Sequence, residues 1–220
     1  MRAVPPPPPY NPPQDLPLDI VFRDAALIVV DKPAGLLAVP GRGSERQDCL
    51  ETRLEVRFGP LIAVHRLDMD TSGLMIFART RDAHSILSGQ FRSHAIEKVY
   101  TALVSGRVDG ETGTIDLPIG RDWEHRPLRR IDRTDGKPAI THWRRLRQDE
   151  NAALLKLTPK TGRTHQLRLH CASTGHPILG DRLYGDAESA ERLCLHACGL
   201  SFAHPVNEAR VELTTPAPFA

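Results

Sequence analysis

The chain has 220 residues, of which 40% are hydrophobic and 25% are charged. This balance is typical of a soluble globular protein, and the length allows one sizeable domain or two small ones with a shared core. The sequence shows no signal-peptide pattern, no aliphatic run long enough to span a bilayer and no disulfide-like spacing of its four cysteines. We therefore expect a cytoplasmic protein with reduced thiols and no membrane contact.

The net charge of +2 conceals one strongly basic segment. Between Arg121 and Arg147, nine lysine and arginine residues stand against four acidic ones. A basic surface of this kind suits a polyanion, because each neutralised phosphate releases condensed counterions. A solvated face has the same composition, so charge alone leaves both interpretations open.

Residues 1–17 differ in composition from the rest of the chain. Prolines 5 to 9 are consecutive, and three more follow by residue 17. Such a segment favours polyproline II and cannot form a hydrophobic core, so it is predicted to be a tail preceding a domain over residues 18–220. An extended arm lying on that domain is favoured over a ligand for an SH3-like partner.

Beyond the tail, the hydrophobic pattern predicts three helices. The first begins at Asp48, with Glu51 completing a capping box. The second is capped by Thr80 and runs to about residue 91, and the third begins near His165 with Thr164 at its cap. Predicted strands do not alternate regularly with these helices; they cover residues 26–30, 74–78, 98–104, 139–146, 153–157, 193–202 and 210–214. This order predicts an α+β fold with a large, mainly antiparallel mixed sheet flanked by helices.

A polar cluster lies between an apolar approach and the buried strand that begins near Leu74. It contains Asp68, with Arg66 two residues before it and the hydroxyls of Thr71 and Ser72 after it. A carboxylate in such company can be held ionised and aimed at an electrophile. A turn in which Asp and Thr only bond the backbone would give the same pattern, so the segment alone leaves both open.

A second cluster runs from Lys160 to His170. Gln166, Arg168 and His170 are too close along a helix to share one face fully, so only some of them can point into a site. A guanidinium here could pair with a remote carboxylate, lower its pKa and fix its rotamer. The alternative is a first helical turn with satisfied surface arginines.

Together the two clusters resemble the RluA family of pseudouridine synthases. The motif of that family, H-R-L-D-x-x-T-S-G-L, has every fixed letter in place at residues 65–68 and 71–74. Other family-like stretches lie in the family's order along the chain, so that the likeness covers residues 20 to 215; they are residues 30–36 before the motif and residues 98–100, 162–185 and 195–197 after it. Ordered matches over this much of the chain make coincidence implausible. The resemblance implies one pseudouridine synthase catalytic domain.

The resemblance also assigns roles. Asp68 would be the nucleophile, attacking either C6 of uracil or C1′ of the ribose. Tyr100 would lie against the target base and help to remove the C5 proton, and Arg168 would pair with Asp68. Arg66 would help to fill the space left by the flipped uridine, since a stacked base cannot present both faces to the enzyme. His65 is expected to hold the loop by hydrogen bonds, and Thr71 is grouped with the substrate-binding residues.

The reaction implied is redox-neutral and exchanges a C–N bond for a C–C bond within one nucleotide. It therefore requires no cofactor and no metal. The expected partner is RNA rather than DNA, and a monomer is the default expectation.

The substrate is expected to be a structured RNA loop. The catalytic aspartate lies so near the start that no N-terminal S4 domain has room, which is the pattern of the short members of the family. Those act on the tRNA anticodon stem-loop and on a hairpin of 23S rRNA, read through shape and stacking. In the basic segment, Arg126, Arg129 and Arg130 would contact phosphates and Trp123 would stack on a base. Trp123 could equally form a small satellite core.

The strongest rival is a magnesium-dependent phosphatase. The segment from Asp68 to Thr71 loosely matches the D-x-D-x-T start of haloacid-dehalogenase enzymes. Such an enzyme needs its first Asp directly after an apolar strand. Here His65 and Arg66 stand where apolar residues belong, and Arg168 would have no role, so we reject this reading.

Two further alternatives are disfavoured. An RNA chaperone on the same fold would bind without catalysis, but Asp68, Tyr100 and Arg168 are all present. A metal site at Cys194-Leu195-His196-Ala197-Cys198 lacks a partner pair nearby, so a half-buried strand with small apolar thiols is favoured.

Overall fold

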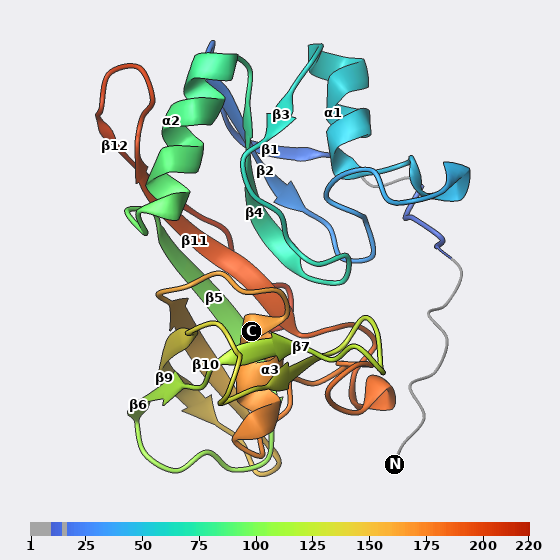
Figure 1. The fold of residues 1–220 in the computed structure, drawn as a ribbon, viewed down its shortest axis with the longest axis vertical. Coiled ribbons are helices and arrows are strands. Elements are labelled where there is room, and N and C mark those ends of the chain that lie inside the picture. The colour runs from blue at the N-terminus through green and yellow to red at the C-terminus, as the bar shows by residue number, and fades with distance from the viewer. Residues whose placement is uncertain (1–9, 15–16) are drawn as a thin grey trace. The chain divides into compact units, whose positions relative to one another are not determined.

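The computed structural model describes residues 10–14 and 17–220 and divides them into two compact units (Figure 1). Of the described residues, the N-terminal unit comprises 10–14, 17–98 and 197–216, and the C-terminal unit comprises 99–196 and 217–220. Residues 1–9 and 15–16 of the expected tail lie outside the described residues.

The N-terminal unit contains two helices, α1 (Leu50–Phe58) and α2 (Arg81–Arg92). Its strands follow the hydrogen-bonded order β1-β2-β4-β11, with β3 paired to β4 and β12 to β11. Their bounds are Asp19–Arg23 for β1, Leu27–Lys32 for β2, Ile62–Ala63 for β3, Ser72–Ala78 for β4, Leu195–Ala203 for β11 and Arg210–Thr214 for β12. The first two residues of β11 belong to the other unit.

Residues 27–30 of β2 and 74–78 of β4 are all apolar and buried, and helices lie on both faces of these strands (Figure 1). On one face, Ile28 and Phe77 pack with Leu54 of α1. On the other face, Val29 and Ile76 pack with residues that include Leu87 of α2. The two clusters share no residue, so alternate positions of each strand supply two separate cores.

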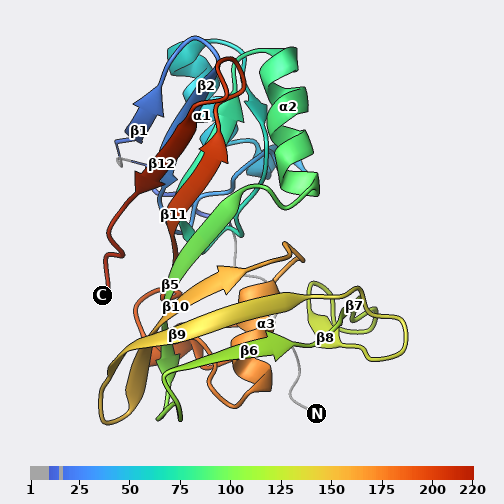
Figure 2. The same cartoon turned by 90° about the vertical axis from the view of Figure 1, so that its left-hand side faces the viewer.

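The C-terminal unit contains α3 (Gln166–Ser173) and strands in the order β5-β10-β9-β6. Their bounds are Glu97–Ser105 for β5, Thr112–Asp116 for β6, Ile140–Gln148 for β9 and Ala152–Pro159 for β10. Helix α3 packs on this sheet through Leu167 and Cys171, which share a core cluster with Leu155 and Leu157 of β10 (Figure 2). Strands β7 (Ile119–Arg121) and β8 (Arg129–Ile131) form a separate antiparallel ribbon.

The predicted fold class is confirmed. In the described part of the chain, ten strands are connected in one sheet, and every pairing whose register is known is antiparallel. The seven predicted strands and three predicted helices are all present, with ends shifted by a few residues. The sequence reading missed five short strands, namely β1, β3, β6, β7 and β8.

Two predicted helix caps were wrong. The cap of α1 is Cys49, which forms the capping box with Thr52, because the carboxylate of Asp48 accepts two hydrogen bonds from Arg53 at 2.6 and 2.8 Å instead. Glu51 therefore has no part in the box.

At α3 the cap is His165 rather than Thr164. His165 has a left-handed backbone (φ 57°) and no side-chain cap bond. The turn before the helix is closed by the side chain of Gln166, whose Oε1 accepts from the Arg163 N–H at 3.0 Å.

Candidate active site

Asp68 lies in the N-terminal unit, on the loop that leads from β3 into β4. Its carbonyl accepts a hydrogen bond from the Thr71 N–H at 3.1 Å, which closes a tight turn. Asp68 is partly exposed, whereas Thr71 and Ser72 are buried. The hydrogen bond that closes this turn therefore uses the backbone oxygen of Asp68 and not its carboxylate.

Gly73, the one fixed glycine of the motif, is required by close packing. Its φ is +118°, and a Cβ there would lie 2.4 Å from the backbone N and O of Ala197 in β11. Only glycine tolerates both this backbone conformation and this approach. The residue thus fixes the point where the loop enters the sheet.

The buried ammonium group of Lys32 ties the loop to the end of β2. Its Nζ donates to the carbonyls of Pro33 at 2.8 Å, Leu36 at 2.6 Å and Met69 at 2.9 Å, and its side chain is fully buried. The Met69 carbonyl also accepts from the Gly35 N–H at 3.0 Å. Because an ammonium has three N–H donors, these carbonyls compensate part of the cost of burying the charge. Met69 directly follows Asp68, so the loop is anchored next to the proposed nucleophile.

His65 holds the other end of the loop, as the sequence predicted for its hydrogen bonding. Its Nε2 accepts from the Ile76 N–H at 3.0 Å, and its ring lies on Phe91 with the centroids 4.6 Å apart. Burial, followed by the nearby charge of Lys98, lowers the pKa of His65 to about 3. The ring is therefore neutral at physiological pH, as an acceptor Nε2 requires.

Arg168 lies in the C-terminal unit and forms a buried ion pair with Asp181. Its Nε and Nη2 donate to the two carboxylate oxygens at 2.8 and 2.6 Å. Both side chains are almost fully buried, at 4% and 0% exposure. Burial raises the pKa of the Asp181 carboxyl, but the hydrogen bond and charge of Arg168 outweigh it, so this pKa lies below its ordinary value.

The Arg168–Asp181 pair is one end of a polar network. The Arg168 guanidinium lies 5.5 Å from the ring centroid of Tyr184. The Tyr184 hydroxyl accepts from the Arg129 N–H and contacts Nδ1 of His165, both at 2.8 Å. Through this network the first turn of α3 is joined to β8. The β7–β8 ribbon is called the basic ribbon below, because it carries Arg121, Arg129 and Arg130.

Tyr100 lies on β5, opposite Leu157 of β10, and is partly buried against the core of the C-terminal unit. The predicted site residues are divided between the two units. The N-terminal unit holds His65, Arg66, Asp68 and Thr71, and the C-terminal unit holds Tyr100 and Arg168. Arg66 is exposed. The pairing of Arg168 with Asp68 and the contact of Tyr100 with the base stay predictions.

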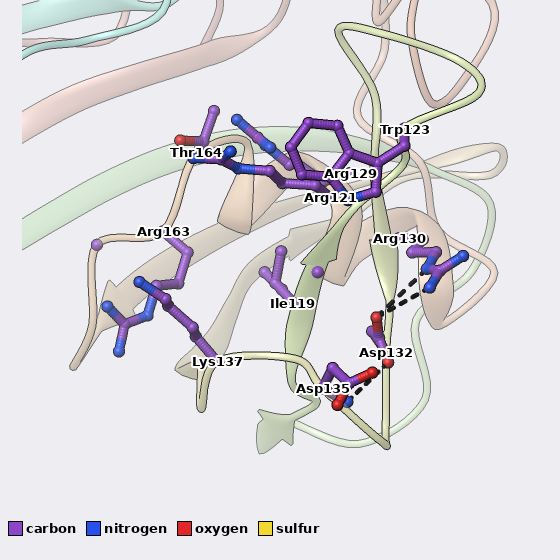
Figure 3. Close-up of a pocket in the computed structure, with 12 residues that line it drawn as sticks. Ile119, Arg121, Trp123, Arg129, Arg130, Asp132, Asp135, Lys137, Arg163 and Thr164 are labelled. Carbon is purple, nitrogen blue, oxygen red and sulfur yellow. Dashed lines mark hydrogen bonds and ion pairs between the residues drawn. The ribbon is translucent and has the colours of Figure 1, made fainter.

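The basic ribbon borders a cavity of about 590 Å³ in the C-terminal unit (Figure 3). Its polar lining is dominated by basic side chains, with two carboxylates; these residues are Arg121, Arg129, Arg130, Lys137, Arg163, Asp132 and Asp135. The Arg130 guanidinium donates to the Asp132 carboxylate at 3.1 Å, so part of the positive charge is compensated on that side. The volume falls within the roughly 300–1,000 Å³ of ligand sites.

Trp123 lines the same cavity and is 59% exposed, which excludes a satellite core. The guanidinium groups of Arg121 and Arg126 lie 5.1 and 4.7 Å from its ring centroid. Two of the predicted RNA-binding arginines, Arg129 and Arg130, line the cavity as well. The Nε of Arg129 is buried and has no hydrogen-bond partner among the described residues.

Other kinds of site find no support in the described part of the chain. There, no group of three or more His, Cys, Asp or Glu side chains is placed to hold a metal ion, and this includes the Cys194–Cys198 segment. No helix in residues 10–14 and 17–220 has the length and hydropathy needed to cross a bilayer.

Comparison with protein families gives a direct match. The model of the RNA pseudouridylate synthase family matches residues 26–173, which include the Asp68 loop, Tyr100 and Arg168. The chain belongs to this family. The protein is therefore an RNA pseudouridine synthase, an isomerase that converts uridine to pseudouridine, and the phosphatase alternative is excluded.

Individual relatives are similar in sequence to this chain over nearly its whole length. The dual-specificity RNA pseudouridine synthase RluA of Vibrio parahaemolyticus is 46% identical over 89% of this chain and 82% of its own length. RluA of Escherichia coli is 42% identical over 96% of this chain and 98% of its own. Among solved structures, human RNA pseudouridylate synthase domain containing 1 matches with a TM-score of 0.80 and 32% identity, covering 96% of this chain and 87% of that one.

Sequence reasoning missed three residues of the synthase that hold the candidate site. Lys32, Asp181 and Tyr184 each lie in a family-like block, which was the available signal. Arg168 was expected to pair with Asp68, which stays a prediction, and the ion pair that the structure describes for it is with Asp181.

Proposed function

We propose that the synthase modifies uridines in structured RNA loops and that its substrates are the tRNA anticodon stem-loop and 23S rRNA. The name shared by its relatives, dual-specificity RNA pseudouridine synthase, supports two classes of RNA. The match to the E. coli relative covers 96% of this chain. We place the enzyme in the cytoplasm as a monomer, following the sequence.

In the proposed mechanism Asp68 is the nucleophile. The carboxylate attacks C6 of uracil or C1′ of ribose, the bond between N1 and C1′ breaks, and the base rotates. C5 then bonds to C1′, the bond to Asp68 breaks and restores the carboxylate, C5 loses its proton and N1 gains one. The observation that carries this role is the anchoring of the Asp68 loop on both sides, by Lys32 at Met69 and by His65 at Ile76. A fixed loop holds a reactive carboxylate in an attacking geometry, which is a large part of rate enhancement. Tyr100 and Arg168 complete the proposed catalytic set.

The cavity beside the β7–β8 ribbon is proposed to receive the RNA backbone. Phosphate oxygens match the guanidinium and ammonium groups of Arg129, Lys137 and Arg163 that line it (Figure 3). The exposed ring of Trp123 offers a face for a splayed-out base.

The test uses transcripts labelled with tritium at C5 of uridine, one carrying a tRNA anticodon stem-loop and one a 23S rRNA fragment. Wild type is expected to release tritium from both, and Asp68→Asn from neither, while binding RNA with unchanged affinity. Release by Asp68→Asn at the wild-type rate would overturn the assignment of the nucleophile. Release from neither RNA by wild type would overturn the substrate assignment and leave RNA binding as the function of this chain on those RNAs.

Mapping of pseudouridine in cells with and without the gene complements this assay. Loss of modification in both tRNA and 23S rRNA is expected. Loss in only one of them would contradict dual specificity.

A further inference from the structure

A segment before the first strand, Tyr10–Pro13, is fixed to the N-terminal unit at both ends. The Tyr10 hydroxyl donates to the Asp48 carbonyl at 2.7 Å and accepts from the Leu37 N–H at 3.1 Å. At the other end, Nη1 of Arg53 donates to the Pro13 carbonyl at 2.7 Å. The part of the expected tail that the structure describes thus lies on the domain as an extended arm.

The peptide group between Leu36 and Leu37 links this arm to the interior. Its N–H donates to the Tyr10 hydroxyl, and its C=O accepts from Nζ of Lys32 at 2.6 Å. One side chain from the arm and one from the end of β2 therefore hold the opposite ends of a single peptide group. A peptide held at both ends cannot rotate without breaking one of these hydrogen bonds, of which the one to Lys32 is buried and the one to Tyr10 is partly buried.

Lys32 continues the connection to the Asp68 loop. The same Nζ donates to the Met69 carbonyl at 2.9 Å, and the Lys32 side chain is fully buried. The Gly35 N–H donates to that carbonyl as well, at 3.0 Å, from the turn that precedes Leu36. Hydrogen bonds in series in a low-dielectric interior strengthen one another, so a change at one end is felt along the chain.

We propose that Tyr10 is a positioning residue for Asp68. Its hydroxyl sets the orientation of the Leu36–Leu37 peptide, that peptide fixes the ammonium of Lys32, and Lys32 fixes the carbonyl next to Asp68. The proposal rests on the proposed role of Asp68 as nucleophile. Because Tyr10 acts on the geometry of attack and not on RNA contacts, its loss should lower the rate of the chemical step and leave RNA affinity unchanged.

The experiment compares Tyr10→Phe, Thr80→Val and Asp68→Asn with wild type in single-turnover tritium release over a range of enzyme concentrations. Tyr10→Phe keeps the ring and removes only the hydroxyl. Thr80→Val is the matched control, because it removes the cap of α2, a hydrogen bond at 3.1 Å to the Ala83 N–H in the same unit, and touches none of the links described above. Thermal unfolding is measured for each variant.

Tyr10→Phe is expected to lower the maximal single-turnover rate on the order of tenfold, because misplacement of a reacting group by a fraction of an ångström costs this much. The enzyme concentration for half-maximal rate should stay within twofold of wild type, and Thr80→Val should keep the wild-type rate. A wild-type rate for Tyr10→Phe would overturn the proposal. So would a loss confined to RNA affinity, or equal losses in both variants that follow their unfolding temperatures.

Asp68→Asn separates this proposal from the one it rests on. If Asp68→Asn is inactive and Tyr10→Phe is not slowed, only the positioning role fails. If Asp68→Asn keeps the wild-type rate, the nucleophile assignment fails, and the positioning of Asp68 fails with it.

Discussion

At the scale of single residues, the buried pair of Arg168 and Asp181 carries a strong stability prediction. Asp181→Asn removes the charged partner of the two short hydrogen bonds from a guanidinium that is 4% exposed, which should cost about 3–5 kcal/mol of unfolding free energy at pH 7. Removing the cation as well, in Arg168→Met with Asp181→Asn, should recover part of this loss, while the introduced amide oxygen can still accept from the Leu183 N–H. Urea denaturation of both variants measures the difference. Equal stability of the single and double variants would contradict the buried-charge explanation.

The same pair predicts a response to acid. The pKa of Asp181 is lower in the folded than in the unfolded protein, so its stabilising contribution is complete above the unfolded pKa of about 3.9 and is lost as pH falls through the folded pKa. The stability difference between wild type and Asp181→Asn should therefore be constant from pH 7 to about 5 and shrink below about 4. A difference that began to shrink at neutral pH would point to another titrating group.

His65 predicts a second, separate pH dependence. Its pKa falls from about 6.5 in the unfolded chain to about 3 in the folded protein, so the unfolded state binds an additional proton between these values. Unfolding free energy should then decrease as pH is lowered from 6.5, by up to about 1.4 kcal/mol per pH unit. His65→Gln keeps an acceptor for the Ile76 N–H but does not titrate, so its unfolding free energy should change less between pH 7 and 4. Parallel pH curves for the two proteins would refute this account.

At the scale of secondary-structure elements, the entry of the Asp68 loop into β4 depends on Gly73. Gly73→Ala would place a Cβ 2.4 Å from the backbone of β11, and we expect a loss of at least about 4 kcal/mol or a failure to fold. Gly59→Ala is the matched control, because Gly59 has a positive φ of +79° and an added Cβ there would have no atom within 4 Å, so it should cost only the backbone strain of about 1–3 kcal/mol. Thermal unfolding distinguishes them. Similar losses in both would show that backbone conformation alone, and not the approach of β11, requires glycine.

The elements also show how far the sequence could predict this fold. Strands β2 and β4 were found because burial on both faces makes them continuously apolar, and α2 because Thr80 gives an ordinary cap. The β7 and β8 strands have three residues each, too few to show a period of two. The cap of α1 was placed one residue early because a cysteine is an uncommon cap and Arg53 competes for Asp48.

The candidate site was predictable only where a residue type itself indicates the chemistry. The motif identified Asp68, and the basic segment identified Trp123, Arg129 and Arg130, since these residues carry the chemistry themselves. The anchoring of the loop by Lys32 could not be predicted from the sequence, because Lys32 binds backbone carbonyls, which every residue type has. One of these carbonyls also lies 37 residues away along the chain. Likewise, nothing in the local pattern indicates that Arg168 pairs with Asp181.

At the scale of the whole molecule, a net charge of +2 gives little general attraction to RNA, so binding must depend on local cations. If the cavity beside the β7–β8 ribbon holds phosphates, Lys137→Gln should weaken RNA binding uniformly across sequences and reduce the slope of log K against log salt by about 1. Arg81→Gln removes the same charge from the first turn of α2, outside this cavity, and should leave the slope within experimental error of wild type. Fluorescence anisotropy with one anticodon stem-loop at several salt concentrations measures both slopes. Because both variants have the same net charge, a difference between them can come only from where the cation lies, and equal slopes would remove the cavity from the RNA-binding surface.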